Sequence, residues 1–475
     1  MRNFFLNYRL LISLLSIMTC FLSLNAGALK IASIFTDNMV LQRGKYIRIF
    51  GNATSGEIVY VSLGTNKSIA NVDVNGRWVA YLNPEEADDN PRNLIIECNN
   101  EKIILNNILI GDVWLASGQS NMQMKIANID SLEKKKIIST NDNLLRYYQV
   151  AHVVSGGKIN KSSDISWTSL YNGNCIDWSA VAVNFALEMR KQLKVPIGII
   201  CVAQGSSNIE SWIGRNYSKI DKIKSHFQKD LEDVNIQSNY KNAHRLYDSM
   251  LSKVSGYTIK GIIWYQGEAN AKSGIAKDYG CLLSSLIENW RETWSDERMI
   301  FGVVQLPNYN YKESMSSTEH SWAVLRQQQK DVCDSMRNTV MAVSADLGEN
   351  NNIHPKKKNE VSKRLCYEIL NAFYGKKELP ISPRLGNPKL KNGNIVIPIL
   401  STSCVQDKSL VNGFEVSASG FNFKPVKAQI SNGHVIVYTE GIDCKYIRYA
   451  WTNTPVLNIY DKNNLPASPV LFKIK

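Results

Sequence analysis

Several common signatures are absent from the 475-residue chain. It contains neither Gly-x-Ser-x-Gly nor His-Glu-x-x-His, which argues against the usual α/β-hydrolase nucleophile turn and against a zinc protease. Its nine cysteines form no Cys-x-x-Cys pair and do not cluster with its six histidines, so we expect neither a metal site nor a cofactor. One or two disulfides are compatible with these cysteines, but their spacing indicates no particular pairing.

Long apolar runs are lacking beyond the amino terminus. There, Arg2 and Arg9 precede the apolar residues 10–24, and small residues follow, which predicts a secretory signal peptide over residues 1–28. No later stretch approaches the roughly 18 apolar residues that span a bilayer, so we expect no transmembrane segment. The mature chain is expected to be secreted or periplasmic, with lipidation of Cys20 as a minor alternative.

Acidic residues are fewer than basic residues, and the formal net charge is +13. Two short basic runs occupy residues 134–136 and 356–358. No nucleic-acid motif accompanies them, so we expect solvated lysines and no nucleic-acid partner. A positive surface mildly favours an anionic sugar as substrate, although salt screens such attraction beyond about 10 Å.

Both ends of the mature chain have the pattern of small β domains. Residues 29–107 contain short alternating segments such as 47–50 and 58–61, separated by glycines, which predicts an N-terminal β domain. Residues 377–475 return to short β segments such as 395–399. We interpret this C-terminal β region as a structural appendage, with a carbohydrate-binding surface as the alternative.

Between them, residues 108–376 alternate apolar strands with helices, for example the helical patterns near 178–189 and 359–374. This alternation predicts a three-layer α/β/α domain with a parallel sheet. The predicted strands are residues 110–116, 197–203, 259–265, 299–306 and 339–343.

The first of these strands ends abruptly in Gly118-Gln119-Ser120-Asn121. A serine at the carboxyl end of a parallel strand lies where reacting groups gather in open α/β sheets, and it can attack an acyl carbon if a base is near. The alternative is an ordinary turn in which Ser120 caps a helix.

His354 follows the last predicted strand, within Asn352-Ile353-His354-Pro355. Neutral imidazole can take the serine proton and return it to a leaving alkoxide. Because Ser120 and His354 both follow parallel strands, we expect them at the same sheet edge. The other five histidines lie in less informative surroundings.

With these residues in place, the chain resembles sialate O-acetylesterase-like proteins, a branch of the SGNH esterase superfamily. The resemblance covers almost the whole length, and its motifs occur in family order. They are residues 33–43 (SIFTDNMVLQR), 118–122 (GQSNM), 209–212 (IESW), 264–270 (WYQGEAN), 353–355 (IHP) and 448–451 (RYAW).

The resemblance implies roles for particular residues. Ser120 matches the family's nucleophile and His354 its general base, while Gly205 and Gln266 match the donors of the oxyanion hole. Such donors must meet the charge of a tetrahedral intermediate, and losing one typically costs about 10²- to 10³-fold in rate.

The sequence departs from the family beside His354. The position two residues before it is often acidic in the family but is Asn352 here, so the site is either a dyad or a triad whose carboxylate comes from Glu349 or Glu268. Asn352, Glu349 and Glu268 remain the candidates for orienting the imidazole.

Further departures are Ser206 where a second glycine is common, and Gln123 and Gln327 where glutamate is common.

Trp212, Arg215 and Asn270 are the candidates for substrate binding, whereas Trp114 and Trp264 are expected in the core. The resemblance implies a serine esterase that removes O-acetyl groups from sialic acids. The alternatives are an acetylesterase acting on another glycan such as xylan, and a non-catalytic glycan-binding protein.

Overall fold

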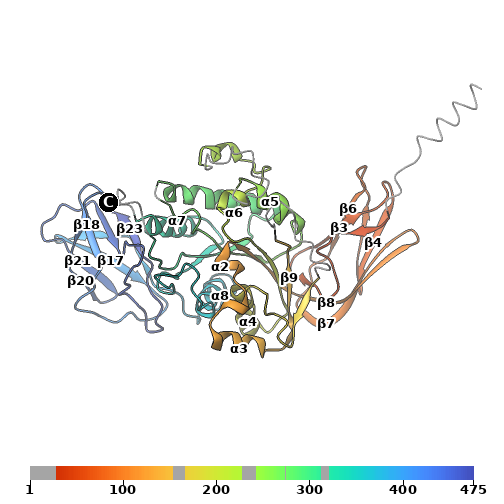
Figure 1. Ribbon diagram of the computed structural model, residues 1–475, viewed down its shortest axis with the longest axis horizontal. Coiled ribbons are helices and arrows are strands. Elements are labelled where there is room, and N and C mark those ends of the chain that lie inside the picture. The colour runs from red at the N-terminus through yellow and green to blue at the C-terminus, as the bar shows by residue number, and fades with distance from the viewer. Residues whose placement is uncertain (1–27, 153–165, 227–241, 273, 312–319, 475) are drawn as a thin grey trace, which may run out of the picture. The chain divides into compact units, whose positions relative to one another are not determined.

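The computed structural model describes residues 28–152, 166–226, 242–272, 274–311 and 320–474 (Figure 1). Apart from its last residue, the predicted signal peptide lies outside these ranges, as does Cys20. Across the described ranges no helix has the length and apolar content to cross a membrane. The chain divides into two compact units, Met1–Asp112 with Gly256–Thr258, and Val113–Ser255 with Ile259–Lys475.

The first unit is built from β-strands whose side chains alternate between core and solvent. In the strand Ile47–Asn52, for example, Ile47 and Ile49 are buried while their neighbours are partly exposed. One sheet has the order β1-β3-β6, and β7 pairs antiparallel with both β4 and β8. The strands are β1 (Lys30–Ile31), β2 (Val40–Gln42), β3 (Ile47–Asn52), β4 (Ile58–Leu63), β5 (Asn66–Asn71), β6 (Arg77–Leu82), β7 (Asp88–Cys98) and β8 (Glu101–Gly118).

The second unit contains a sheet of order β10-β9-β11-β8-β12-β13-β14, to which β8 contributes its carboxyl-terminal part. β9 is parallel to β11, and β12 is parallel to both β8 and β13. β10 is antiparallel to β9. The further strands are β9 (Asp142–Gln149), β10 (Thr168–Leu170), β11 (Ile197–Ala203), β12 (Gly261–Tyr265), β13 (Ile300–Val304) and β14 (Thr339–Ala342).

All five strands predicted from the apolar runs are present, but the sheet also contains β10 and β9, which those runs did not predict. β9 is the longer of the two. Its sequence, DNLLRYYQ, begins with polar residues and contains Arg146, so no continuous apolar run marks it. Arg146 is nevertheless buried. Pairing with β11 on one side and β10 on the other determines this strand.

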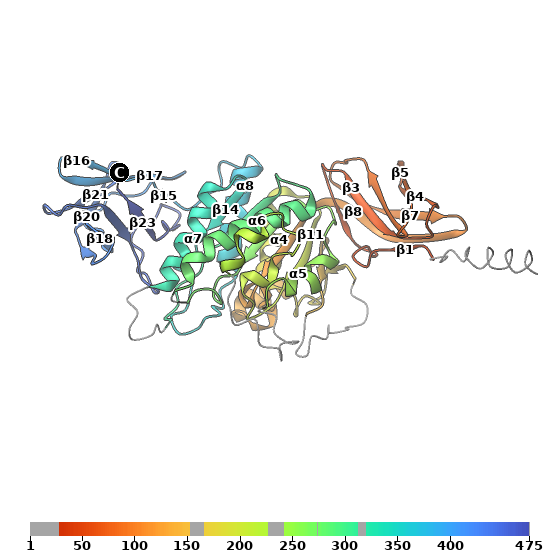
Figure 2. The same ribbon diagram turned by 90° about the horizontal axis from the view of Figure 1, so that it is seen from above.

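Helices pack on this sheet in two pairs. α4 and α8 contact each other, and so do α6 and α7; in Figures 1 and 2 the two pairs lie on different sides of the strands. A core that includes Trp114, Phe185 and Leu365 fills the space under α4 and α8. The α-helices are α2 (Ser120–Gln123), α3 (Ser131–Ile138), α4 (Ala180–Leu193), α5 (Arg245–Ser249), α6 (Tyr279–Trp294), α7 (Ser321–Ser335) and α8 (Asn359–Phe373). The domain is therefore mixed α/β.

The C-terminal residues form two small antiparallel sheets around their own apolar core. One has the order β15-β17-β21-β20 with β16 on β17, and the other β19-β18-β22-β23. The buried Arg326 of α7 donates to the carbonyl oxygens of Thr452 and Asn453, which anchors this region to the helix. The strands are β15 (Arg384–Leu385), β16 (Lys389–Lys391), β17 (Asn394–Leu400), β18 (Phe414–Ser417), β19 (Lys424–Pro425), β20 (Ala428–Ser431), β21 (His434–Tyr438), β22 (Tyr446–Tyr449) and β23 (Val470–Lys473).

Gly118 ends β8 and allows the chain to turn into α2. Its φ is +140°, and a Cβ added there would lie 2.1 Å from the carbonyl oxygen of Tyr265. The next residue, Gln119, donates its N–H to that same oxygen at 3.0 Å. Only glycine fits this close approach to β12.

Gly118→Ala should therefore destabilise the protein by about 3 kcal/mol or more, since it combines an unfavourable φ with overpacking. The thermal unfolding midpoint measures this. Gly433→Ala is the control, because Gly433 also has positive φ but no heavy atom within 4 Å of an added Cβ. Equal losses in the two variants would contradict the steric argument.

Candidate active site

Ser120 lies at the end of β8, as the first residue of α2. The interpretation of Ser120 as a helix cap is wrong, because Gln119 occupies the cap position and makes no side-chain cap bond. Instead, the Ser120 Oγ is 2.8 Å from Nε2 of His354. The hydroxyl therefore has a base within hydrogen-bonding distance.

His354 lies in the loop between β14 and α8 and is 234 residues from Ser120 in the chain. Burial lowers the pKa of His354, and the positive charge of Lys358 lowers it further. A histidine with a pKa below its ordinary value is neutral at pH 7. It can then accept the serine proton at Nε2 when the ring hydrogen is on Nδ1.

None of the three candidates for orienting His354 touches its ring. Asn352 holds the backbone instead: its Oδ1 accepts from the His354 N–H at 3.0 Å, and its Nδ2 donates to the His354 carbonyl at 2.9 Å. Glu349 accepts from Asn352 Nδ2 and from the Lys356 N–H. Across the described residues, no carboxylate forms an ion pair or hydrogen bond with the imidazole.

Glu268, the third candidate, belongs to a buried chain of side chains beneath the site. Its Oε1 accepts from Asn121 Nδ2 at 2.5 Å, and Asn121 Oδ1 accepts from the Lys358 ammonium at 2.5 Å. Asn121 Nδ2 also donates to the carbonyl of Ile353 at 3.0 Å. One amide thus links the residue after the nucleophile to the residue before the histidine.

The two charges in this chain are strongly desolvated. Lys358 is completely buried, and its pKa falls to about 8 because of that burial, with Glu268, Glu133 and Glu349 opposing the shift. Burial raises the pKa of Glu268, while its bond to Asn121 and the charge of Lys358 lower it. The expectation of a solvated lysine run is wrong at this position.

Sequence reasoning missed both Asn121 and Lys358, although each stands within four residues of a predicted catalytic residue. A polar residue beside a motif carries no signal of burial, and only the fold brings these two together.

The expected oxyanion donor Gly205 lies against the nucleophile. A Cβ added at Gly205 would be 3.6 Å from the Ser120 Cβ. Its N–H already donates to Gln123 Oε1 at 2.6 Å. Ser206, which follows, has a φ of +60°, a conformation that explains why glycine is common there in the family.

Gln266 is completely buried at the end of β12, and its carboxamide is fully hydrogen-bonded. Its Nε2 donates to the Ser207 carbonyl at 3.2 Å and to Asn270 Oδ1 at 2.8 Å, and its Oε1 accepts from Tyr279 at 2.9 Å. In this arrangement neither amide hydrogen is directed to an incoming substrate.

The three substrate-binding candidates are bound to other parts of the protein, and their role in substrate binding stays a prediction. Trp212 is completely buried, donates to Ser207 Oγ and packs edge-on against Trp264. Asn270 is buried and bound to Ile209, Glu210 and Gln266.

Arg215 is exposed and forms an ion pair with Asp248 at 3.3 Å. The sequence around Trp212 and Arg215 does not indicate the direction in which either side chain points. As predicted, Trp114 and Trp264 are core residues.

A cleft of about 730 Å³ opens beside the two catalytic candidates. Its lining mixes amides, lysines and apolar side chains, and contains no carboxylate. The lining residues are Ser120, Gln123, Met124, Lys125, Ala127, Asn128, Ile129, Lys134, Asn352, His354 and Lys356.

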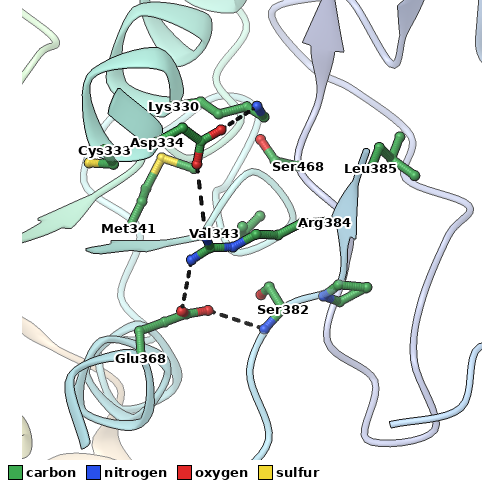
Figure 3. A pocket seen from close by; sticks show the side chains of 11 residues that line it. Lys330, Cys333, Asp334, Met341, Val343, Glu368, Ser382, Arg384, Leu385 and Ser468 are labelled. Atoms are coloured by element: carbon green, nitrogen blue, oxygen red, sulfur yellow. Dashed lines mark hydrogen bonds and ion pairs between the residues drawn. The ribbon is translucent and has the colours of Figure 1, made fainter. Parts of the chain in front are cut away.

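A second cavity, of about 30 Å³, lies between α7, α8 and β15. Figure 3 shows Arg384 between Asp334 and Glu368, with Glu368 also bound to the Ser382 N–H. Burial raises the pKa of Glu368 to about 7. A space of this size holds about one water molecule, so we interpret the cavity as structural.

The described residues include no group of three or more His, Cys, Asp or Glu side chains placed to hold a metal ion. All eight cysteines from Cys98 to Cys444 are free thiols in the structure.

Three comparisons with known proteins bear on this site. The family model for sialic acid-specific acetylesterases, a carbohydrate esterase family, matches residues 110–371. The sialate O-acetylesterase of Mus musculus is 26% identical over 94% of each chain, and that of Homo sapiens is 28% identical over 90% of this chain and 88% of its own. The crystal structure of a carbohydrate acetylesterase from Xanthomonas citri matches 94% of this chain and 99% of its own, with a TM-score of 0.82 and 27% identity.

The bonds of Asn352 predict the effect of replacing it. Asn352→Ala removes both bonds to the His354 backbone and should lower kcat on an acetyl ester by about 10- to 100-fold through misplacement of the ring. Asn352→Asp keeps the acceptor for the His354 N–H but loses the donor and faces Glu349 with like charge, so it should also be slower than the wild type. The exposed neighbour provides the control Asn351→Ala. Wild-type or better activity of Asn352→Asp would show that a carboxylate there reaches the ring.

The charge of Lys358 predicts a pH effect. Lys358→Met combined with Glu268→Gln removes both buried charges and leaves neither unpaired. Because Lys358 lowers the pKa of His354, its loss should raise that pKa and move the acidic limb of kcat/KM to higher pH. Lys357→Met, at an exposed position, is the control. An unchanged acidic limb in the folded double variant would contradict this coupling.

Proposed function

The chain belongs to the family of sialic acid-specific acetylesterases, which are carboxylic ester hydrolases, and we propose that it removes O-acetyl groups from sialic acids with Ser120 as nucleophile and His354 as general base. The observation that carries the proposal is the 2.8 Å contact between Ser120 Oγ and His354 Nε2. The conserved order of motifs and the cleft beside this pair support it.

In the first half of the reaction, Ser120 Oγ attacks the acetyl carbon while its proton passes to His354 Nε2. The tetrahedral intermediate collapses, the bond to the sugar oxygen breaks, and that oxygen takes the proton from His354. The products of this half are the free sugar hydroxyl and an acetyl-serine.

In the second half, His354 removes a proton from water as the water attacks the acetyl-serine. Collapse of the second tetrahedral intermediate releases acetate, and the proton returns to Ser120. Neither half of the reaction requires a cofactor.

Without a carboxylate on the ring, the imidazolium formed during attack is stabilised only weakly. We therefore interpret the pair as a dyad, whose ring is positioned by the backbone bonds of Asn352 and by the Asn121 contact to Ile353.

Gly205 N–H and the Gln266 carboxamide remain the proposed oxyanion donors. For Gly205 to act, the carbonyl oxygen of the acetyl group must replace Gln123 Oε1 on its N–H. For Gln266 to act, its Nε2 must leave the Ser207 carbonyl, the longer of its two bonds.

The finer architectural predictions belong to the same proposal. The helix pairs α4/α8 and α6/α7 would form the outer layers of an SGNH-type α/β/α domain over residues 108–376. Residues 29–107 and 377–475 would be the flanking β domains. A signal peptide at residues 1–28 would direct the mature chain to a secreted or periplasmic location.

A second substrate class is a neutral acetylated glycan such as xylan, favoured by the similarity to a carbohydrate acetylesterase of Xanthomonas citri. The catalytic residues would be the same for both classes. A purely glycan-binding role is disfavoured, since the serine and histidine retain hydrogen-bonding distance.

Ser120→Ala should abolish acetate release, with a loss of at least about 10³-fold, because no other hydroxyl replaces the nucleophile. Released acetate is measured on a panel of O-acetylated sialic acids and acetylated xylo-oligosaccharides. Ser131→Ala, at the exposed start of α3, is the matched control. Turnover by folded Ser120→Ala would exclude Ser120, and wild-type turnover of the xylo-oligosaccharides alone would exclude sialic acids as the substrate class.

A further inference from the structure

We infer that Lys134 and Lys356 form a subsite for the carboxylate of a sugar acid in the cleft beside Ser120. The inference rests on the proposed function, because it requires an acetylated sugar to bind with its ester at Ser120. It adds a reason why this site would select a sialic acid over a neutral sugar.

The two lysines approach the cleft from different segments that a backbone bond holds together. Lys134 lies on the first turns of α3, where its N–H donates to the Asp130 carbonyl at 2.9 Å. Lys356 follows His354 by two residues, and its carbonyl accepts from the Asp130 N–H at 3.3 Å. Asp130 thus binds the backbone of both residues, and both side chains line the same cleft.

The positive charge in the cleft is not cancelled by its lining, which contains three lysines and no carboxylate. Lys125 is paired with Asp177 at 2.8 Å. Lys134 donates to the Ala127 carbonyl at 3.2 Å, which fixes its ammonium and leaves two N–H donors. Within the described chain, the Lys356 ammonium has no ion pair.

The carboxylates of Asp130 and Glu349 accept hydrogen bonds from groups other than the ammonium groups of these lysines. Asp130 Oδ1 accepts from the N–H groups of Leu132 and Glu133 at the start of α3. Glu349 accepts from the Lys356 N–H and from Asn352 Nδ2. Among the described residues, neither carboxylate forms an ion pair with Lys134 or Lys356, although the Lys356 N–H, the Asn352 amide and then the charge of Lys356 lower the pKa of Glu349.

The remainder of the lining suits the rest of such a substrate. Met124, Ala127 and Ile129 offer apolar surface for acetyl methyl groups, and Asn128 and Asn352 offer amides for hydroxyl groups. In the pyranose ring of a sialic acid, the carboxylate and the glycerol chain are attached to the two carbons that flank the ring oxygen. A cleft lined by Ser120, Lys134 and Lys356 can therefore bind the carboxylate and an ester on the glycerol chain of one sugar.

The test compares an O-acetylated N-acetylneuraminic acid with its carboxyl methyl ester, which has the same acetyl group and no charge. For the wild type, KM for the methyl ester should be about tenfold or more above KM for the acid, because charge-assisted hydrogen bonds are lost. The variant Lys134→Gln with Lys356→Gln should reduce this ratio to near one by raising KM for the acid, with a smaller change in kcat. The control Lys135→Gln with Lys357→Gln removes two exposed lysines of the same two runs and should keep the wild-type ratio.

The outcomes separate the subsite from the proposed function. If the wild type hydrolyses both sialic acid substrates with equal KM, or if the lysine variant keeps the wild-type ratio, the function stands and the subsite is wrong. If it hydrolyses acetylated xylo-oligosaccharides but neither sialic acid substrate, the proposed function fails and the subsite with it.

Discussion

The active site depends on one buried amide. Asn121 accepts from the fully buried ammonium of Lys358 and donates to Glu268 and to the Ile353 carbonyl. Buried charges are costly unless they are hydrogen-bonded, so the lysine, the amide and the carboxylate must stay together. Because Asn121 follows the nucleophile and Ile353 precedes the base, this requirement also fixes the distance between Ser120 and His354.

The electrostatics of the site differ from those of a serine triad. In a triad a carboxylate stabilises the imidazolium, whereas here burial, and then the charge of Lys358, lower the pKa of His354 and favour the neutral imidazole. Positioning is supplied separately, through backbone bonds from Asn352. The site therefore favours the neutral imidazole of His354 over the imidazolium. Stabilisation of the transition state would then depend mainly on the proposed oxyanion donors.

Those donors are engaged with the protein's own oxygens in this structure. Gly205 N–H binds Gln123, and Gln266 binds Ser207 and Asn270. A substrate carbonyl that displaces Gln123 gives the Gly205 N–H a new acceptor, while Gln123 Oε1 loses its donor. The same cleft is lined by Lys134 and Lys356, the proposed subsite for the carboxylate of an acidic sugar.

The sequence by itself determined the periodic features and singled out the two residues proposed to react. Continuous apolar runs predicted β8, β11, β12, β13 and β14, because a parallel strand buried on both faces must be apolar along its length. Ser120 and His354 were identified because each follows such a strand. Only the tertiary structure decided the rest: that β9 joins the sheet despite its polar residues, that Trp212 faces the core, that Glu268 binds Asn121 rather than the imidazole, and that Lys358 is buried while Lys134 and Lys356 line the cleft. Each of these features depends on the direction in which a side chain points and on the residues that other segments of the chain bring beside it. Local sequence composition contains no information on either.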